Sequence, residues 1–226
     1  IASISPHAFF AFYKMASVSI PSTVTSIGDK AFEDCMKLKS VTIPDSVESI
    51  GSFAFTRQVP SRLLSELQTW FVDRNPFQDC LKLSEINVGE RNSSFASFDG
   101  MLFDASRTHL IFCPPRKSRV CLPDSTVVIG KEAFSGCMKL TEVTLPSTLR
   151  SIGEGAFRNC KTLKSITIPD SITSIGDGAF RGCNELVSVV FPNVLPFIGK
   201  DVFAECRNLT LLHSDTVMGI GQYAFP

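Results

Sequence analysis

A unit of 23 residues recurs along most of this 226-residue chain, and this repeat constrains the fold more than any other feature. The unit reads L-x-x-V-x-I-P-x-x-V-x-x-I-G-x-x-A-F-x-x-C, with Gly, Phe and Cys seven, eleven and fourteen residues after the Pro, and Gln58 is the one exception to the Cys. One such unit cannot bury its own apolar side, so a fixed period of this length predicts a solenoid of stacked coils. The anchor prolines are Pro21, Pro44, Pro123, Pro146, Pro169 and Pro192.

The pattern within one unit predicts its local structure. Apolar and polar residues alternate over residues 163–168, which indicates a half-buried strand. Pro169 cannot donate to a strand ladder and ends the strand, and a second short extended stretch ends at Ile175. Gly176 permits a turn with positive φ, and residues 179–183 have the spacing of one helical turn. The predicted fold class is α/β, a right-handed solenoid with short parallel strands and one short helical turn per coil.

The repeat resembles the BspA-like class of leucine-rich repeat, which occurs in bacterial surface proteins and in large families of protists. Like that class, the chain lacks the Asn ladder of the commoner leucine-rich repeats. The resemblance implies a ligand- or protein-binding surface without enzymatic activity. It transfers no site residues, because the shared positions are core positions. Bacterial relatives imply the cell surface, whereas a ladder of free thiols is compatible with an intracellular or organellar compartment, so the location stays open.

The repeat predicts one solenoid domain over residues 1–226, with regular coils at 1–59 and 122–226. Between them, residues 60–75 carry an apolar stripe at helical spacing and predict an amphipathic helix in place of a strand. Two interpretations remain: the stripe caps the core, or the helix docks a partner. The docking candidates on this helix are Trp70, Phe71 and Arg74.

The second irregular stretch, residues 87–121, predicts a hairpin-like insert. Asp99 and Gly100 stand between two apolar runs, a strong hairpin signal, and residues 109–112 read as a further strand. Asn92 begins a glycosylation acceptor pattern, which matters only in a secreted protein. The loop at 114–119 holds the chain's local basic cluster, either a solvated turn or a contact for an acidic partner. Its basic residues are Arg116, Lys117 and Arg119.

The eight cysteines follow the repeat, not a disulfide framework. Six of them stand three residues after the turn Phe and predict a ladder of small buried thiols. Cys113 and Cys121 lie outside this ladder, and a bridge between them stays open. Paired ligands at zinc-finger spacing are absent, so no metal site is expected. The six ladder residues are Cys35, Cys80, Cys137, Cys160, Cys183 and Cys206.

Composition excludes several functions. Lys and Arg number 22 and Asp and Glu number 22, and this neutral balance argues against nucleic acid or an anionic membrane as the partner. No apolar run approaches the roughly 18 residues of a membrane-spanning helix. The three histidines stand in no known catalytic arrangement, and nucleotide-binding glycine motifs are absent. We therefore expect no enzyme, no cofactor and no membrane insertion.

The outward strand positions form columns of small, mostly uncharged residues, a surface that suits a binding platform but is also ordinary for a solvated sheet. The candidates are Ser40, Thr42, Glu85, Asn87, Glu142, Thr144, Ser165 and Thr167. The leading hypothesis is a protein-interaction module, a scaffold or a surface adhesin, and the second is a structural subunit of a large assembly. The chain opens at Ile1 without Met and stops within the pattern, so we expect a piece of something longer. Its partners are expected to be other protein chains, including at the open ends of the solenoid, where Ile4, Phe9, Phe10, Phe12, Ile220 and Phe225 lack a polar cap.

Overall fold

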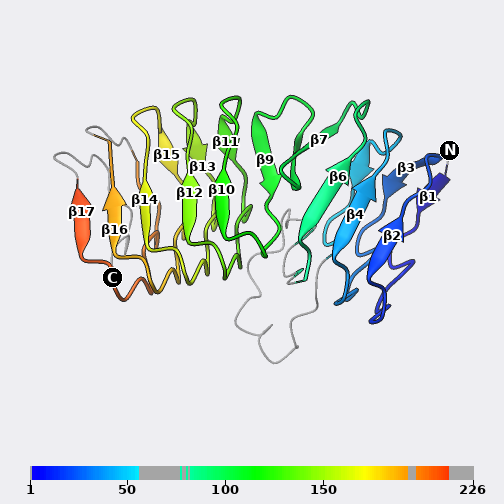
Figure 1. Cartoon of the computed structure of the whole chain (residues 1–226), viewed down its shortest axis with the longest axis horizontal. Helices are drawn as coiled ribbons and strands as arrows, with labels where there is room; N and C mark the ends of the chain where they lie inside the picture. Colours follow the sequence, from blue (N-terminus) through cyan, green and yellow to red (C-terminus); the bar gives the residue numbers. More distant parts are fainter. Residues whose placement is uncertain (1, 56–76, 78–79, 81, 193–196, 214–226) are drawn as a thin grey trace.

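The chain forms an elongated row of stacked coils in a computed structural model, which describes residues 2–55, 77, 80, 82–192 and 197–213 (Figure 1). The predicted helix at 60–75, with Trp70, Phe71 and Arg74, lies outside the described residues. The strands are β1 (Ala2–Ile4), β2 (Ser17–Ser19), β3 (Val24–Ile27), β4 (Ser40–Ile43), β5 (Ser49–Ile50), β6 (Glu85–Val88), β7 (Phe95–Phe98), β8 (Met101–Asp104), β9 (His109–Phe112), β10 (Arg119–Cys121), β11 (Val128–Ile129), β12 (Glu142–Thr144), β13 (Ser151–Ile152), β14 (Ser165–Thr167), β15 (Ser174–Ile175), β16 (Ser188–Val190) and β17 (Leu211–His213).

The strands lie in two rows, and each full coil contributes one strand to each row. One row holds the sheets β2-β4-β6, β10-β12 and β14-β16-β17, and the other holds β1-β3-β5 and β15-β13-β11-β9-β8-β7. Most pairs are parallel with a register of one repeat, as in Ser165 opposite Ser188. The predicted parallel-strand solenoid is therefore confirmed.

Burial follows the predicted alternation. In β14, Ile166 is buried while Ser165 and Thr167 are exposed, and β12 and β10 show the same pattern. A strand of three residues can pair with both neighbours while one face stays dry, because successive side chains point to opposite faces.

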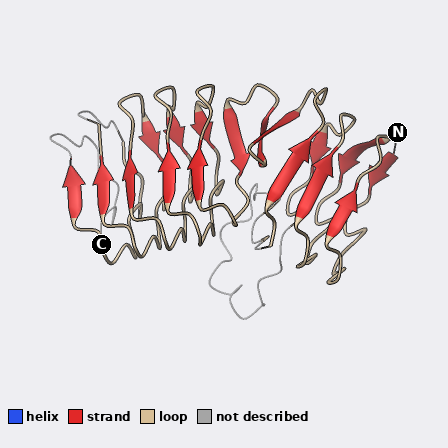
Figure 2. Ribbon diagram, in the orientation of Figure 1, coloured by secondary structure: helices blue, strands red, loops and turns tan. Residues whose placement is uncertain are grey.

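The predicted helical turn per coil is wrong, since no helix occurs among the described residues (Figure 2). Alternate amides of the Ala-Phe-x-x-Cys segment bond within the coil and to the next coil. The Cys137 N–H donates to Phe134 O at 3.1 Å, whereas the Phe134 N–H donates to Ala156 O at 2.7 Å. Glu132 and Gly136, four residues apart, both have positive φ. A residue in this left-handed conformation cannot belong to a right-handed helix, so the two interrupt any helix in this segment. Ladder bonds between coils thus replace the i to i−4 bonds of a helix.

The conserved spacing of Gly within the repeat also has a different cause from the one predicted. Gly153 and Gly176 lie outside the positive-φ region, which Gly155 and Gly178 occupy two residues later. A Cβ on Gly176 would meet Glu154 N at 2.6 Å. The repeat therefore needs Gly here because two backbones approach closely, not because of a left-handed turn.

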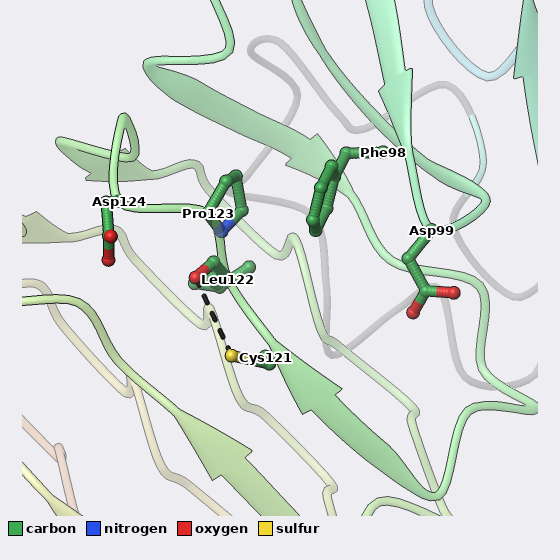
Figure 3. Close-up of a pocket in the computed structure, with 6 residues that line it drawn as sticks. All are labelled: Phe98, Asp99, Cys121, Leu122, Pro123 and Asp124. Atoms are coloured by element: carbon green, nitrogen blue, oxygen red, sulfur yellow. Dashed lines mark hydrogen bonds between the residues drawn. The ribbon is translucent and has the colours of Figure 1, made fainter.

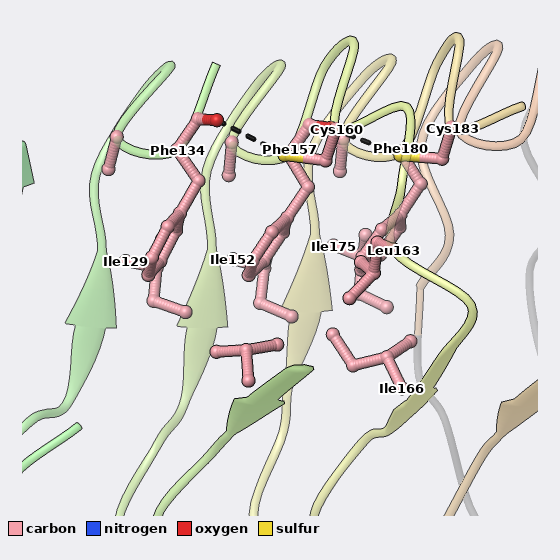
Figure 4. Packing of buried hydrophobic residues seen from close by; sticks show 14 of the residues in the cluster. Ile129, Phe134, Ile152, Phe157, Cys160, Leu163, Ile166, Ile175, Phe180 and Cys183 are labelled. Carbon is pink, nitrogen blue, oxygen red and sulfur yellow. Dashed lines mark hydrogen bonds between the residues drawn. The ribbon is translucent and has the colours of Figure 1, made fainter. Parts of the chain in front are cut away.

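The core consists of rows of identical side chains. Phe134, Phe157 and Phe180 are fully buried and stack with centroids 4.7 and 5.1 Å apart and nearly parallel planes (Figure 4). A second column of stacked rings runs from the N-terminal coils into the insert, and the two columns belong to two core clusters. Its rings are Phe9, Phe32, Phe55, Phe77 and Phe112.

The hairpin in the insert is confirmed. β7 and β8 pair antiparallel, and Asp99 and Gly100 at the turn have φ of 48° and 68°, which fits the type I′ turn favoured by Asp-Gly. The strand predicted at residues 109–112 is β9, which joins the hairpin to the regular coils that follow. The insert thus continues one row of strands while interrupting the other.

Candidate interaction surface

The outward residues of the first strand row form the candidate face. The predicted columns do lie on this row: within β12 and β14 their side chains are exposed on either side of a buried residue. The same holds in β4 and β6, except that Ser40 is half-buried. Parallel pairing at one-repeat register aligns the columns across neighbouring coils. The structure therefore brings together the candidates Ser40, Thr42, Glu85, Asn87, Glu142, Thr144, Ser165 and Thr167 on one face.

Two members of this face escaped the sequence analysis. Arg119 and Cys121 are the outward residues of β10, opposite Glu142 and Thr144 of β12. Arg119 was expected in the basic loop at 114–119, and the face was expected to hold small, mostly uncharged residues. Its side chain is 80% exposed, and its Nε lies 3.4 Å from a Glu142 carboxylate oxygen. The missed signal was the 23-residue distance from Arg119 to Glu142, which places both in one column.

The basic loop is largely neutralised by its neighbours. The Lys117 ammonium lies 2.7 Å from the Asp99 carboxylate at the hairpin turn, and Lys117 is only 17% exposed. Arg119 pairs with Glu142, and Arg116 is exposed. The loop therefore presents less free positive charge than its sequence suggested, which weakens the hypothesis of an acidic partner there.

A recess of about 430 Å³ opens where the hairpin meets β10 (Figure 3). The ring of Phe98 faces Pro123 and Leu122 across it. Asp99 and Asp124 add two carboxylates, and the exposed Cys121 completes the lining. The recess is thus lined by apolar side chains and by two carboxylates.

The thiol ladder is confirmed as buried at five of its six predicted members, while Cys80 is half-buried, and all eight cysteines are free. The thiols of Cys160 and Cys183 each donate to the carbonyl oxygen of the Phe in the preceding coil at 3.1 Å, visible as dashed lines in Figure 4. That oxygen also accepts the amide of the Cys in its own coil. Cysteine suits this position because it is small and apolar yet can donate one weak hydrogen bond.

Cys113 belongs to this ladder, contrary to the sequence analysis. It is fully buried, and the Cys137 thiol donates to its carbonyl oxygen at 3.6 Å. Cys121, by contrast, is exposed on the face, so the possible bridge between Cys113 and Cys121 is absent. The irregular spacing of the insert concealed the role of Cys113, because this Cys directly follows the stacked Phe112.

Removing one ladder thiol should cost stability in a pH-dependent way. Cys160→Ala is expected to lower the free energy of unfolding by about 1–2 kcal/mol at pH 7, through a lost hydrogen bond and lost packing. Burial raises the pKa of the Cys160 thiol. Because the unfolded thiol ionises near about pH 8.5 while the folded one stays protonated, this stabilisation is complete below that pH and declines above it.

The cost of Cys160→Ala should therefore shrink as pH rises from about 8 to 10, by at most about 1.4 kcal/mol per pH unit. Urea unfolding across this range measures it, with Ser165→Ala as a control whose effect should not change with pH. A cost that grew with pH would contradict a protonated, buried thiol.

Asn92 has a structural role. Its side-chain amide donates to Pro44 O at 2.8 Å and to Val47 O at 2.9 Å, and its oxygen accepts the amides of Ser94 and Phe95. The side chain is almost fully buried. A glycan requires an accessible amide, so this buried Asn92 side chain does not suit glycosylation. Asn92 serves as a polar link between the insert and the preceding coil.

Across the described residues, no three His, Cys, Asp or Glu side chains converge to bind a metal ion. The same residues include no helix that is long and apolar enough to span a membrane.

Two rows of short parallel strands on coils with a stacked Phe core define a leucine-rich-repeat solenoid. The chain belongs to the BspA type leucine-rich repeat family, whose model matches residues 2–112 and 111–226 in six copies. No match was found among curated protein sequences.

Solved bacterial structures share the fold. A leucine-rich repeat protein from Eubacterium ventriosum has 21% identity and a TM-score of 0.61, with 95% of this chain and 71% of that chain covered. The pneumococcal vaccine antigen PcpA has 22% identity and a TM-score of 0.66, covering 94% and 56%. A leucine-rich cell surface protein from Faecalibacterium prausnitzii has 24% identity and a TM-score of 0.66, with 96% of this chain and 58% of that chain covered. The chain thus spans between about half and three quarters of these neighbours.

Proposed function

We propose that this chain is a non-catalytic protein-interaction module of the scaffold or surface-adhesin type. The observation that carries the proposal is the face of aligned, exposed strand residues, which repeats from coil to coil on each side of the insert. Large solenoid faces of this kind commonly bind other proteins. A vaccine antigen and a cell surface protein among the structural neighbours support the adhesin form of the proposal.

The composition of the face indicates how it binds. The residues of its columns are small and polar. Arg119 on β10 is an arginine, a residue type that is enriched in the energetic hot spots of protein interfaces. We therefore expect affinity to come from a large contact area with a few stronger contacts near β10. Partners are proteins, and neither nucleic acid nor membrane insertion is part of the proposal.

A photo-activated cross-linking amino acid at Thr144 or at Thr167 tests this function. Both positions are exposed on the face, whereas Lys161 is exposed on a turn outside the strand row and serves as the control. In intact source cells and their native surroundings, the two face positions should cross-link the same protein, and Lys161 should not. Equal products from all three positions, or none from the face, would contradict the proposal.

A structural subunit of a larger assembly is the second candidate. The observation that favours it is an exposed aromatic group on the N-terminal coil, where Phe10, Phe12 and Tyr13 are 39%, 53% and 53% exposed. In an assembly, another chain would cover these rings. Mass photometry of gently prepared extracts separates the candidates, because a free single-chain species supports the module and a large stable complex supports the subunit.

A further inference from the structure

The first strand row is interrupted at the insert, and at this break one strand edge has no partner among the described strands. On one side of the break, the hairpin covers the edge of β6: the Ile86 N–H donates to Gly100 O at 2.8 Å, and the Val88 N–H donates to Ser97 Oγ at 3.1 Å. On the other side, β10 pairs with β12 alone among the described strands. The open recess lies between the hairpin turn and β10.

The ladder pattern shows which backbone groups of β10 face the recess. The Leu122 N–H donates to Thr144 O at 3.2 Å, and Ser118 O accepts the Thr141 N–H at 2.8 Å, so Ser118 and Leu122 face β12. In a parallel pair, alternate residues point to opposite sides. The N–H and C=O groups of Arg119 and Cys121 therefore point to the recess side, and no hydrogen bond among the described residues engages them.

The side chains around this edge define the chemistry of a partner. Phe98 is 37% exposed beside the buried Leu122, so an apolar side chain on a partner could pack between them. Asp99 and Asp124 border the recess, and the Lys117 ammonium neutralises only Asp99. The Asp124 carboxylate has no ion pair among the described residues, and it favours a basic residue over an acidic one.

We propose that β10 is a strand-addition site, which accepts an extended peptide segment of another protein with alternating apolar and basic residues. The backbone of the segment pairs with Arg119 and Cys121, an apolar side chain contacts Phe98, and a basic side chain lies near Asp124. Main-chain pairing at a sheet edge supplies affinity, and alternate side chains supply specificity. This inference rests on the proposed interaction function and assigns it a defined site.

The test uses the purified chain and a labelled peptide, Thr-Val-Lys-Val-Thr-Val-Lys-Val-Thr, followed by fluorescence polarisation. Cys121→Pro removes the N–H that faces the recess and leaves the ladder to β12 intact, as proline is tolerated on an edge strand. We expect it to weaken binding at least about tenfold, whereas Cys121→Ser should stay within about twofold. Thermal unfolding verifies that both variants fold. A peptide N-methylated on alternate residues, and one with Glu in place of Lys, should also bind at least about tenfold more weakly.

Amide hydrogen exchange observed by NMR locates the contact. The Arg119 and Cys121 amides should exchange rapidly in the free chain and at least about tenfold more slowly with the peptide. Unchanged binding by Cys121→Pro, or unchanged binding of the N-methylated peptide, would overturn the proposal. So would protection that rises with protein concentration without peptide, because a second copy would then occupy the edge. Absence of peptide binding alongside specific cross-links from Thr144 would refute this site and leave the interaction function standing.

Discussion

Phe157→Ala is expected to lower the free energy of unfolding by about 3–5 kcal/mol. Phe157 is fully buried and stacks between Phe134 and Phe180 at 4.7 and 5.1 Å. Truncation removes a whole ring from the column, and the neighbouring coils cannot close the gap because ladder hydrogen bonds hold them at a fixed spacing. Urea unfolding measures the loss.

Ser165→Ala is the control in the same coil. Ser165 is exposed in β14, so the substitution should change the free energy of unfolding by no more than about 0.5 kcal/mol. Similar losses for the two variants would contradict the assignment of one side chain to the core and the other to the face.

The second large effect is expected from Gly176→Ala, which should cost about 3 kcal/mol or prevent folding. The added Cβ would meet Glu154 N at 2.6 Å and Gly153 C at 2.8 Å. Both are backbone atoms, and the Gly176 N–H donates to Ile152 O at 2.8 Å, so neither coil can retreat without losing a ladder bond. Thermal and urea unfolding, with circular dichroism as a check on folding, measure the effect.

Gly136→Asn provides the comparison at a glycine of another kind. Gly136 has φ of +73°, and a Cβ there would meet no atom within 4 Å. Asparagine tolerates this left-handed region, and Asn159 adopts it one coil later with φ of 59°. We expect a change of no more than about 0.5 kcal/mol, and a loss as large as that of Gly176→Ala would refute the steric account.

Much of this fold could be predicted because its contacts repeat. The alternation around Ile166 shows which strand residues face the core, and the 23-residue period shows which residues stack on one another in neighbouring coils. The helical turn could not be excluded in the same way. The spacing of Ala-Phe-x-x-Cys fits one turn of a helix. The sequence does not show that Glu132 and Gly136 have positive φ or that alternate amides of the segment bond to the next coil, and only the structure reveals both.

The candidate surface was predicted less completely than the core. The regular columns were assigned correctly to one face, but Arg119 was taken as a loop residue and Cys113 as an outsider to the thiol ladder. Both residues lie in the insert. Arg119 was missed although it stands one full period before its partner Glu142, whereas around Cys113 the period changes and sequence distance no longer reports stacking. His109 lies opposite Val128, only 19 residues away, while Ser40 lies opposite Glu85, 45 residues away.

The amino-acid sequence by itself determined the solenoid, its family, the buried rows of Phe and Cys and the polar character of the exposed face. These follow from a period that each coil must satisfy to bury its apolar side against the next. The tertiary structure alone decided how the insert interrupts one row of strands, which edge of β10 no described strand covers and why Gly176 must lack a side chain. Those features depend on backbone groups and on distances between coils, and side-chain identity does not encode them.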